Sequence, residues 1–323
     1  MELKPEIVAR IEKLDEKYKA MGQNLTSYLD GLLFADYLTY WDYIHLDTLL
    51  SLQSPKTSFP DEQVFIMYHQ ITELYFRLCM VEFEQIETRK TMDVDYFISK
   101  LGRINRYFDA LISSFDIMVD GMDVAQFMQF RMSLLPASGF QSGQYRMIEI
   151  CSTDFVNLIT KDQGTKYSGI YTDSMIDGMY EHMYWKAGAT ELSTGQKTLT
   201  LDQFEKKYSP EFLSLAKRFR TRNLSAIYHS LSADQQKEEP LINALKLLDV
   251  NVNINWKLSH YRSAVRYLQK DPVDIAATGG TNWQKYLPPR FQRISFFPDL
   301  WSNEDMENWG KNWVKANVFG KKE

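Results

Sequence analysis

The helical spacing of apolar residues near the end of the chain constrains the fold more than any other feature. Between 250 and 268 these residues recur at steps of four, four, three, four and three: Val250, Ile254, Leu258, Tyr261, Val265 and Leu268. Such spacing places them on one face of an α-helix. Lys270 and Pro272 follow as a cationic last turn and a stop, so we expect the helix to end there.

A second long helix is expected from Ser58 to about Glu87. Ser58 and Asp61 form an approximate capping box, and Pro60 suits the first helical turn. Apolar residues then follow at helical spacing, at Val64, Met67, Ile71, Leu74, Leu78 and Val81. The pattern therefore predicts a helix of several turns with one buried face.

Most of the remaining chain also favours helix. Helical segments are expected at 97–119, 121–134, 142–159, 210–230 and 237–249. Loops are expected at 52–60, 135–141, 161–170, 190–200 and 271–290. Strand signals are short and scattered, and no internal repeat is evident. The sequence therefore predicts an all-α fold of long packed helices.

Composition limits the classes of partner. The formal net charge of -5 gives no electrostatic reason to expect nucleic acid or an anionic membrane. Near the N-terminus Ile7, Ile11 and Leu14 lie among many charges, without the apolar run that a signal peptide or membrane span needs. Cys79 and Cys151 lie in hydrophobic helical contexts, which indicates reduced core thiols. We expect a soluble, cytoplasmic protein that binds small molecules or other proteins.

One histidine occurs in the helix expected at 250–268. Trp256 lies one turn before His260 and Ala264 one turn after it, so the imidazole would stand beside a small residue with room for a flat macrocycle. Such a face suits an axial haem ligand. A single histidine on a half-buried helix face is more often a hydrogen-bonded structural residue, so both interpretations remain open.

At two further positions the sequence allows either a ligand-binding role or a purely structural one. Phe65 lies one turn before His69, and an aromatic ring beside a neutral imidazole can hold a planar heterocycle with an N–H; core packing is the alternative. Arg146 follows a turn of small residues. Its guanidinium can hold a carboxylate through two parallel hydrogen bonds, or it can form a structural ion pair with Glu149.

Several signatures of other active sites do not occur in the sequence. GxGxxG, Walker, HExxH, GxSxG and CxxC patterns are all missing, which removes the simplest nucleotide, zinc-protease, hydrolase and thiol-redox hypotheses. Asp42-x-x-His45 occurs once, and a di-iron bundle would need pairs of Glu-x-x-His. The paired glycines of ATGGTNW let backbone approach a ligand, and Thr278 and Thr281 add hydroxyls, although most Gly-Gly pairs are only turns.

Six segments, taken together and in order, resemble the tryptophan 2,3-dioxygenase family: LTYWDYIHLDTLLSLQSP, DEQVFIMYHQITELYFRL, LLPASGFQSGQYRMIE, WKLSHYRSAVR, ATGGT and FQRISFFPDLW. The resemblance implies an all-α haem b protein, usually a homotetramer, with a haem pocket. It implies insertion of both atoms of O₂ across the C2–C3 bond of L-tryptophan to give N-formylkynurenine. It also implies a helical arm at 1–37 and a single catalytic domain at 38–323, with 160–245 as its divergent part.

The resemblance also assigns roles to residues at matching positions. His260 corresponds to the proximal iron ligand, and His69 to the distal histidine that hydrogen-bonds the indole N–H. Phe65 corresponds to the aromatic residue that packs against the indole. Arg146 matches the arginine that binds the substrate carboxylate, and Thr278 matches the threonine that contacts the ammonium group.

An N-terminal arm and an altered loop complete the resemblance. Tyr40, Tyr43 and Ile44 match an arm that enters a neighbouring subunit's pocket, although core packing also explains them. The family loop usually reads GTGGSSG, whereas here Ala277 replaces the first glycine and 281–283 read TNW. Because this loop lies where substrates are discriminated, a haem monooxygenase or dioxygenase of a modified indole is an alternative. A non-catalytic haem or indole-binding protein and a purely structural helical protein are the others.

Overall fold

The computed structural model describes residues 3–35, 38–134, 141–167, 171–189, 196–268 and 289–311. Contacts divide the chain into two compact units, Met1–Ser54 and Pro55–Glu323. The described residues form helices and turns, with an isolated β-bridge between Ile159 and Met183. The prediction of an all-α fold is confirmed.

The unit Met1–Ser54 contains four helices: α1 (Pro5–Ala20), α2 (Leu25–Phe34), α3 (Tyr40–Tyr43) and α4 (Leu46–Leu50). Asn24 caps α2 by accepting a hydrogen bond from the Thr26 N–H. The rings of Tyr18 and Tyr28 lie 4.4 Å apart and join α1 to α2. Among the described residues of this unit only Leu25 is buried, so most of its apolar side chains face solvent.

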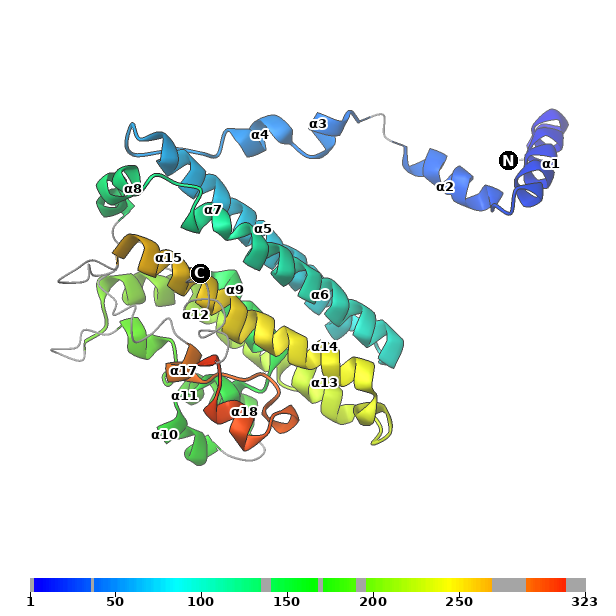
Figure 1. Cartoon of the computed structure of the whole chain (residues 1–323). Coiled ribbons are helices and arrows are strands. Elements are labelled where there is room, and N and C mark those ends of the chain that lie inside the picture. Colours follow the sequence, from blue (N-terminus) through cyan, green and yellow to red (C-terminus); the bar gives the residue numbers. More distant parts are fainter. Residues whose placement is uncertain are drawn as a thin grey trace, which may run out of the picture. The chain divides into compact units, whose positions relative to one another are not determined.

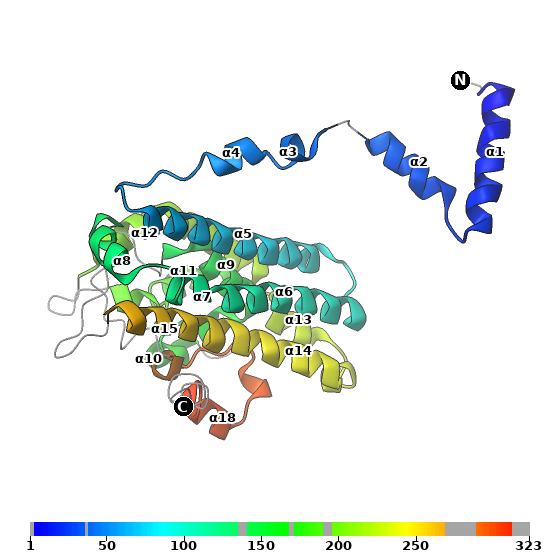
Figure 2. The same cartoon turned by 45° about the horizontal axis from the view of Figure 1, so that its top comes forward.

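Long helices build the unit Pro55–Glu323 around one apolar core. Helix α5 (Pro60–Thr88) packs against α6 (Val94–Ser114) and α9 (Gly143–Ser152), and α9 packs against α12 (Leu199–Phe219). Figures 1 and 2 both show α5 and α6 side by side along most of their lengths. Phenylalanines fill the space between these helices, and Phe76, Phe83, Phe97, Phe108 and Phe212 are fully buried.

A continuous helical rod runs alongside α6 and carries His260. It consists of α14 (Glu239–Val250), a π-helical turn (Asn251–Asn255) and α15 (Trp256–Leu268), and Figure 2 shows it beside α6. The Tyr145 hydroxyl donates to the Val252 carbonyl at 3.2 Å, and the Asn251 amide donates to Asp109 at 2.9 Å. These bonds stabilise the wide turn, since a π turn departs from the regular helical ladder.

Shorter elements complete this unit. They are α7 (Asp116–Val119), α8 (Val124–Phe130), η1 (Arg131–Leu134), η3 (Phe155–Leu158), α10 (Lys161–Gly164), η4 (Thr165–Tyr167), α11 (Asp173–Tyr180), η5 (Lys186–Ala189), α13 (Leu224–Ser230), η6 (Gln235–Lys237), α17 (Pro289–Gln292), η8 (Pro298–Leu300) and α18 (Asn303–Glu307). Both cysteines, Cys79 and Cys151, are free and buried, which confirms that they are core thiols.

The expected cap of the long helix at 60–88 is wrong. The N-cap residue is Phe59, which provides no side-chain cap, so Ser58 and Asp61 do not form a capping box. The buried Glu62 carboxylate instead accepts hydrogen bonds from the backbone N–H groups of Lys56 and Thr57, at 2.8 and 2.7 Å. The Glu62 side chain, in the first turn of the helix, therefore holds the segment that precedes the helix in place.

Several expected helix boundaries are also wrong. The helix expected at 142–159 breaks after Ser152, where Thr153 is extended and its hydroxyl donates to the Phe296 carbonyl. The helix expected at 210–230 begins at Leu199, because Thr198 caps it. It ends at Phe219, and Asn223 caps the next helix. The segments 97–119 and 121–134 each divide into two elements, and the described part of the loop expected at 161–170, residues 161–167, forms short helical turns.

Candidate functional site

His69 lies on α5 with one ring nitrogen fixed by the backbone. Its Nδ1 lies 2.7 Å from the Phe65 carbonyl oxygen, and since a carbonyl only accepts, Nδ1 carries the proton. The rings of Phe65 and His69 have centroids 4.1 Å apart. No described residue hydrogen-bonds Nε2, so that atom offers a lone pair beside the Phe65 ring.

His260 lies on α15 and repeats the same local geometry. Its Nδ1 donates to the Trp256 carbonyl oxygen at 3.1 Å, which leaves Nε2 as the unprotonated nitrogen of a neutral ring. The Trp256 ring and the Phe115 ring lie 4.6 and 4.5 Å from the imidazole between centroids. Ala264, one turn later, is only partly buried. The imidazole thus packs against two aromatic rings and is oriented by its own helix.

Burial keeps both imidazoles neutral. Desolvation lowers the pKa of His260 to about 4, against the opposing effect of the hydrogen bond to Trp256. A positive charge on His69 would lower this pKa further. Desolvation also lowers the pKa of His69, opposed by its bond to Phe65 and by Glu73. Both imidazoles, one on α5 and one on α15, are therefore neutral near pH 7.

These imidazoles are deep in the fold without being sealed from solvent. His69 is exposed and His260 is partly exposed, although enough protein surrounds each ring to disfavour its protonated form. The rings of Tyr68 and Phe115 pack together with centroids 5.7 Å apart, and Tyr68 contacts the ring of His69 while Phe115 contacts that of His260.

We expect the haem-free protein to lose stability in acid because of His260. An unfolded histidine binds a proton near pH 6.5, whereas folded His260 does so only near pH 4, so the unfolded state binds more protons between these values. Stability should therefore fall as the pH falls through this window, by roughly 2 kcal/mol after allowance for partial exposure. Urea unfolding of wild type and His260→Gln at pH 7 and 4.5 measures the effect. A stability difference between the two proteins that is the same at both pH values would contradict it.

Arg146 lies in a separate buried cluster between α9 and the segment after α11. Its Nη1 donates to Glu149 Oε2 at 2.8 Å and to the Tyr184 hydroxyl at 3.0 Å, so the expected ion pair with Glu149 is present. Desolvation opposes the charge on Arg146, but the Glu149 carboxylate outweighs it and raises the pKa of the guanidinium. No described contact joins this cluster directly to His69 or His260.

Tyr184 and Lys257 belong to this cluster and were missed by sequence reasoning. Burial lowers the pKa of Lys257 to about 8, against the attraction of Glu149, and its Nζ lies 3.4 Å from the Tyr184 hydroxyl. Lys257 lies three residues before His260 on the same helix. This spacing is the sequence signal that could have identified Lys257 as a neighbour of the expected site. Tyr184 follows a turn in the divergent part of the chain, and no motif marks it.

The structure does not place the other residues expected at the site. Thr278, with the rest of the ATGGTNW loop, lies outside the described residues. Tyr40, Tyr43 and Ile44 belong to the unit Met1–Ser54, in which Tyr40 and Tyr43 are 72% and 74% exposed. Their predicted contribution to a pocket therefore remains a prediction.

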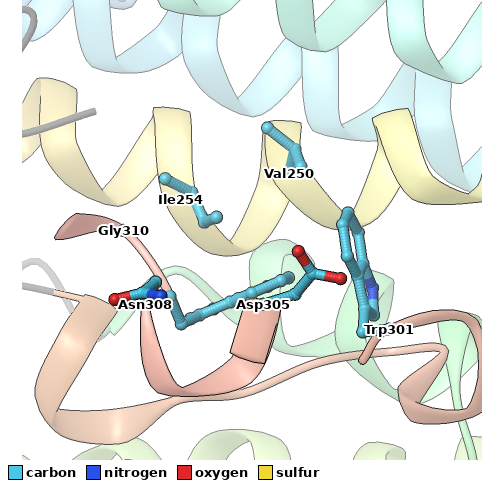
Figure 3. Close-up of a pocket in the computed structure, with 7 residues that line it drawn as sticks. Val250, Ile254, Trp301, Asp305, Asn308 and Gly310 are labelled. Atoms are coloured by element: carbon cyan, nitrogen blue, oxygen red, sulfur yellow. The ribbon is translucent and has the colours of Figure 1, made fainter. Parts of the chain in front are cut away.

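A hollow of about 220 Å³ lies elsewhere in the described structure (Figure 3). Its walls come from the α14 rod and the C-terminal segment: Val250, Ile254, Trp301, Asp305, Asn308, Trp309 and Gly310. None of the expected site residues lines it. Within the described ranges, no helix is both long and apolar enough for a membrane crossing, and no cluster of three His, Cys, Asp or Glu side chains could hold a metal ion.

Comparisons with known proteins agree on one family. The family model for tryptophan 2,3-dioxygenase matches residues 32–192. The tryptophan 2,3-dioxygenase of Bacillus thuringiensis subsp. konkukian (strain 97-27) is 27% identical over 279 residues, which cover 83% of this chain and 92% of that protein. The Bradyrhizobium diazoefficiens (strain USDA 110) enzyme of the same name is 27% identical over 275 residues, with the same coverage.

A shorter match is stronger. The tryptophan 2,3-dioxygenase of Ruegeria sp. (strain TM1040) is 40% identical over 120 residues, which cover 36% of this chain and 42% of that protein. The family and these relatives support a tryptophan dioxygenase function for the chain. The chain is an enzyme of the oxidoreductase class and a divergent member of the tryptophan 2,3-dioxygenase family.

Proposed function

We propose that this chain is a haem-dependent dioxygenase that inserts both atoms of O₂ across the indole C2–C3 bond of L-tryptophan to give N-formylkynurenine. One observation carries the proposal. His69 and His260 come from different helices and contact the mutually packed rings of Tyr68 and Phe115, and each has Nδ1 bound to a backbone carbonyl and no described partner at Nε2. One such nitrogen can hold iron, and the other can accept a hydrogen bond from a substrate N–H.

The residues around His260 fit haem b. An axial haem site needs only one protein imidazole, because the porphyrin supplies the other four nitrogens. The Trp256 carbonyl fixes the tautomer so that Nε2 is the ligand, as metal-binding histidines require. The neighbouring Phe115 and Trp256 rings offer the apolar surroundings that a porphyrin needs. When bound, haem supplies the binding and activation of O₂, and the chain supplies orientation.

The remaining residues would hold the substrate. We propose that His69 Nε2 accepts the indole N–H while Phe65 packs against the ring and limits its tilt. Arg146 would bind the carboxylate, and Thr278 the ammonium group. Because an indole N–H is a very weak acid, His69 would orient the ring and would not need to remove its proton. Fixing both ends of the substrate directs the C2–C3 bond toward the reaction site.

His69→Ala is expected to weaken L-tryptophan binding about tenfold, because the variant lacks one hydrogen bond to the indole N–H. Haem content should be unchanged. The analogue with sulfur in place of the ring N–H cannot make this bond, so its affinity should be nearly equal in wild type and variant. Calorimetric titration of both ligands into haem-loaded proteins measures the difference. The distal assignment would be wrong if His69→Ala abolished haem binding, or if both ligands lost affinity equally.

We propose that the chain acts as a cytoplasmic homotetramer. The arm at 1–37 and the residues Tyr40, Tyr43 and Ile44 would pack on a neighbouring subunit, with 38–323 as the catalytic domain. Support comes from the exposed apolar side chains of the unit Met1–Ser54, of which Leu33 and Phe34 are 80% and 83% exposed. Exposed apolar surface of this kind marks an interaction site in soluble proteins.

Product analysis tests the proposed reaction. Haem-loaded protein is reduced without oxygen, O₂ and L-tryptophan are added, and the product is identified by mass. Ring opening with a gain of two oxygen atoms is expected. A gain of one atom would indicate a monooxygenase, and oxidation only of a substituted indole would indicate that the altered loop selects another substrate. Bound haem without consumption of any indole would indicate a binding protein.

A further inference from the structure

The guanidinium of Arg146 is held at one of its three nitrogen atoms. Nη1 carries two N–H groups, and both are used, by Glu149 Oε2 at 2.8 Å and by the Tyr184 hydroxyl at 3.0 Å. The Tyr184 hydroxyl in turn donates to the other oxygen of Glu149, Oε1. The three side chains therefore close a ring of hydrogen bonds, and all three are buried. This ring fixes where Nη1 lies.

The opposite edge of the same guanidinium, formed by Nε and Nη2, makes no hydrogen bond within the described part of the chain. Arg146 Nε is buried and has no hydrogen-bond partner among the described residues. Leaving a buried donor unpaired is unfavourable, so such an atom suggests a ligand that the protein alone does not supply. The N–H groups of Nε and Nη2 point in parallel, which is the geometry that binds a carboxylate through two hydrogen bonds.

Neighbouring side chains keep the plane of the guanidinium from turning. Its central carbon lies 5.0 Å from the Tyr145 ring centroid and 5.4 Å from that of Trp185. Lys257 donates to the Tyr184 hydroxyl at 3.4 Å, so this hydroxyl accepts two hydrogen bonds and donates one. Lys257 is on α15, the helix of His260, and therefore connects the cluster to the imidazole helix.

We propose that Glu149 and Tyr184 are positioning residues that occupy Nη1 of Arg146 and present its Nε–Nη2 edge to the carboxylate of the amino-acid substrate. This inference rests on the proposed function. It adds Glu149 and Tyr184 to the site, and it specifies the edge of Arg146 that the substrate carboxylate approaches. Without the Tyr184 hydroxyl, the guanidinium loses one of its two anchors and can swing within its own plane about its remaining hydrogen bond to Glu149. The carboxylate would then meet a donor pair that is no longer fixed.

Tyr184→Phe tests this inference with two ligands that differ only in the carboxylate. Calorimetric titration of haem-loaded protein should show L-tryptophan binding about tenfold weaker, the effect of one lost charge-assisted hydrogen bond, and tryptamine binding unchanged. Tyr180→Phe is the matched control, because it removes another buried hydroxyl, bonded to Ser209 Oγ at 2.9 Å. The control should bind both ligands as wild type does.

Equal loss of both ligands in Tyr184→Phe, or no loss of L-tryptophan, overturns the inference. If Tyr184→Phe does not fold, Glu149→Asp decides, since it keeps the charge but moves the carboxylate away from Nη1 and should cause the same carboxylate-selective loss. Failure of the proposed function gives a different result: wild type would then bind neither ligand, or would bind tryptamine as tightly as L-tryptophan.

Discussion

Replacing His260 with alanine is expected to abolish haem binding and oxygenase activity together. His260 Nε2 is the neutral nitrogen that the Trp256 carbonyl and two aromatic rings orient. Loss of an outer partner of a metal ligand already reduces metal affinity or activity roughly 10- to 100-fold. Loss of the ligand itself should exceed that, so we expect more than a hundredfold loss of turnover. Titration with haemin, followed by its absorption band, and a turnover assay measure both effects.

His229→Ala is the matched control for this variant. His229 lies on α13 and pairs at 3.3 Å with Asp299, and both side chains are exposed. It should bind haem and turn over substrate as wild type does. Added imidazole can enter the space left in His260→Ala and should restore part of the absorption band. A His260→Ala protein with a full absorption band and normal turnover would show that iron is held elsewhere.

Local sequence spacing predicted the parts of the site that lie within one helix. Phe65 with His69, and Trp256 with His260, are four residues apart, and helical geometry alone places such pairs on one face. The Arg146–Glu149 ion pair, three residues apart, followed from the same rule as the structural alternative. The fold class followed from the same periodicity, because a repeated apolar face requires packed helices.

Contacts between distant segments were not visible in the sequence. Phe115 against His260, and Tyr184 against Glu149, each join helices or turns whose relative placement depends on the whole core. Capping chemistry explains one wrong boundary: Thr198 caps a helix that begins at Leu199, eleven residues before Pro210, and the proline is tolerated inside it. Such competition between local signals is decided by tertiary packing.

The apolar spacing between 250 and 268 correctly predicted a helix but did not reveal the π turn within it. The first two steps of the apolar series, Val250 to Ile254 to Leu258, are both four residues, and the π turn at Asn251–Asn255 falls there. Ile254 and Leu258 pack with Trp309 in a small second cluster, whereas Tyr261 and Val265 pack against the main core. One apolar stripe thus serves two cores, because the wide turn rotates the helix between them.

Asp249→Ala is expected to be the most destabilising single substitution in the α14 rod. The Asp249 carboxylate is fully buried and accepts hydrogen bonds from five donors: Asn253 Nδ2 at 2.8 Å, Ser295 Oγ at 2.6 Å, Phe296 N at 3.0 Å, Phe297 N at 3.3 Å and Trp301 Nε1 at 2.9 Å. Alanine would leave these donors buried and unpaired. We expect the free energy of unfolding to fall by about 3–5 kcal/mol, which urea unfolding of the haem-free protein measures.

Asp299→Ala is the control for Asp249→Ala, because it removes an exposed carboxylate from the same C-terminal segment and should change stability by less than about 0.5 kcal/mol. Asp249→Asn should lie between them, since its oxygen still accepts hydrogen bonds while its amide group meets other donors. Asp249 also bonds Asn253 within the π turn that leads to His260. Haem affinity should therefore decrease with stability in this series, and an Asp249→Ala protein as stable as wild type would show that the segment 295–301 is held by its apolar contacts instead.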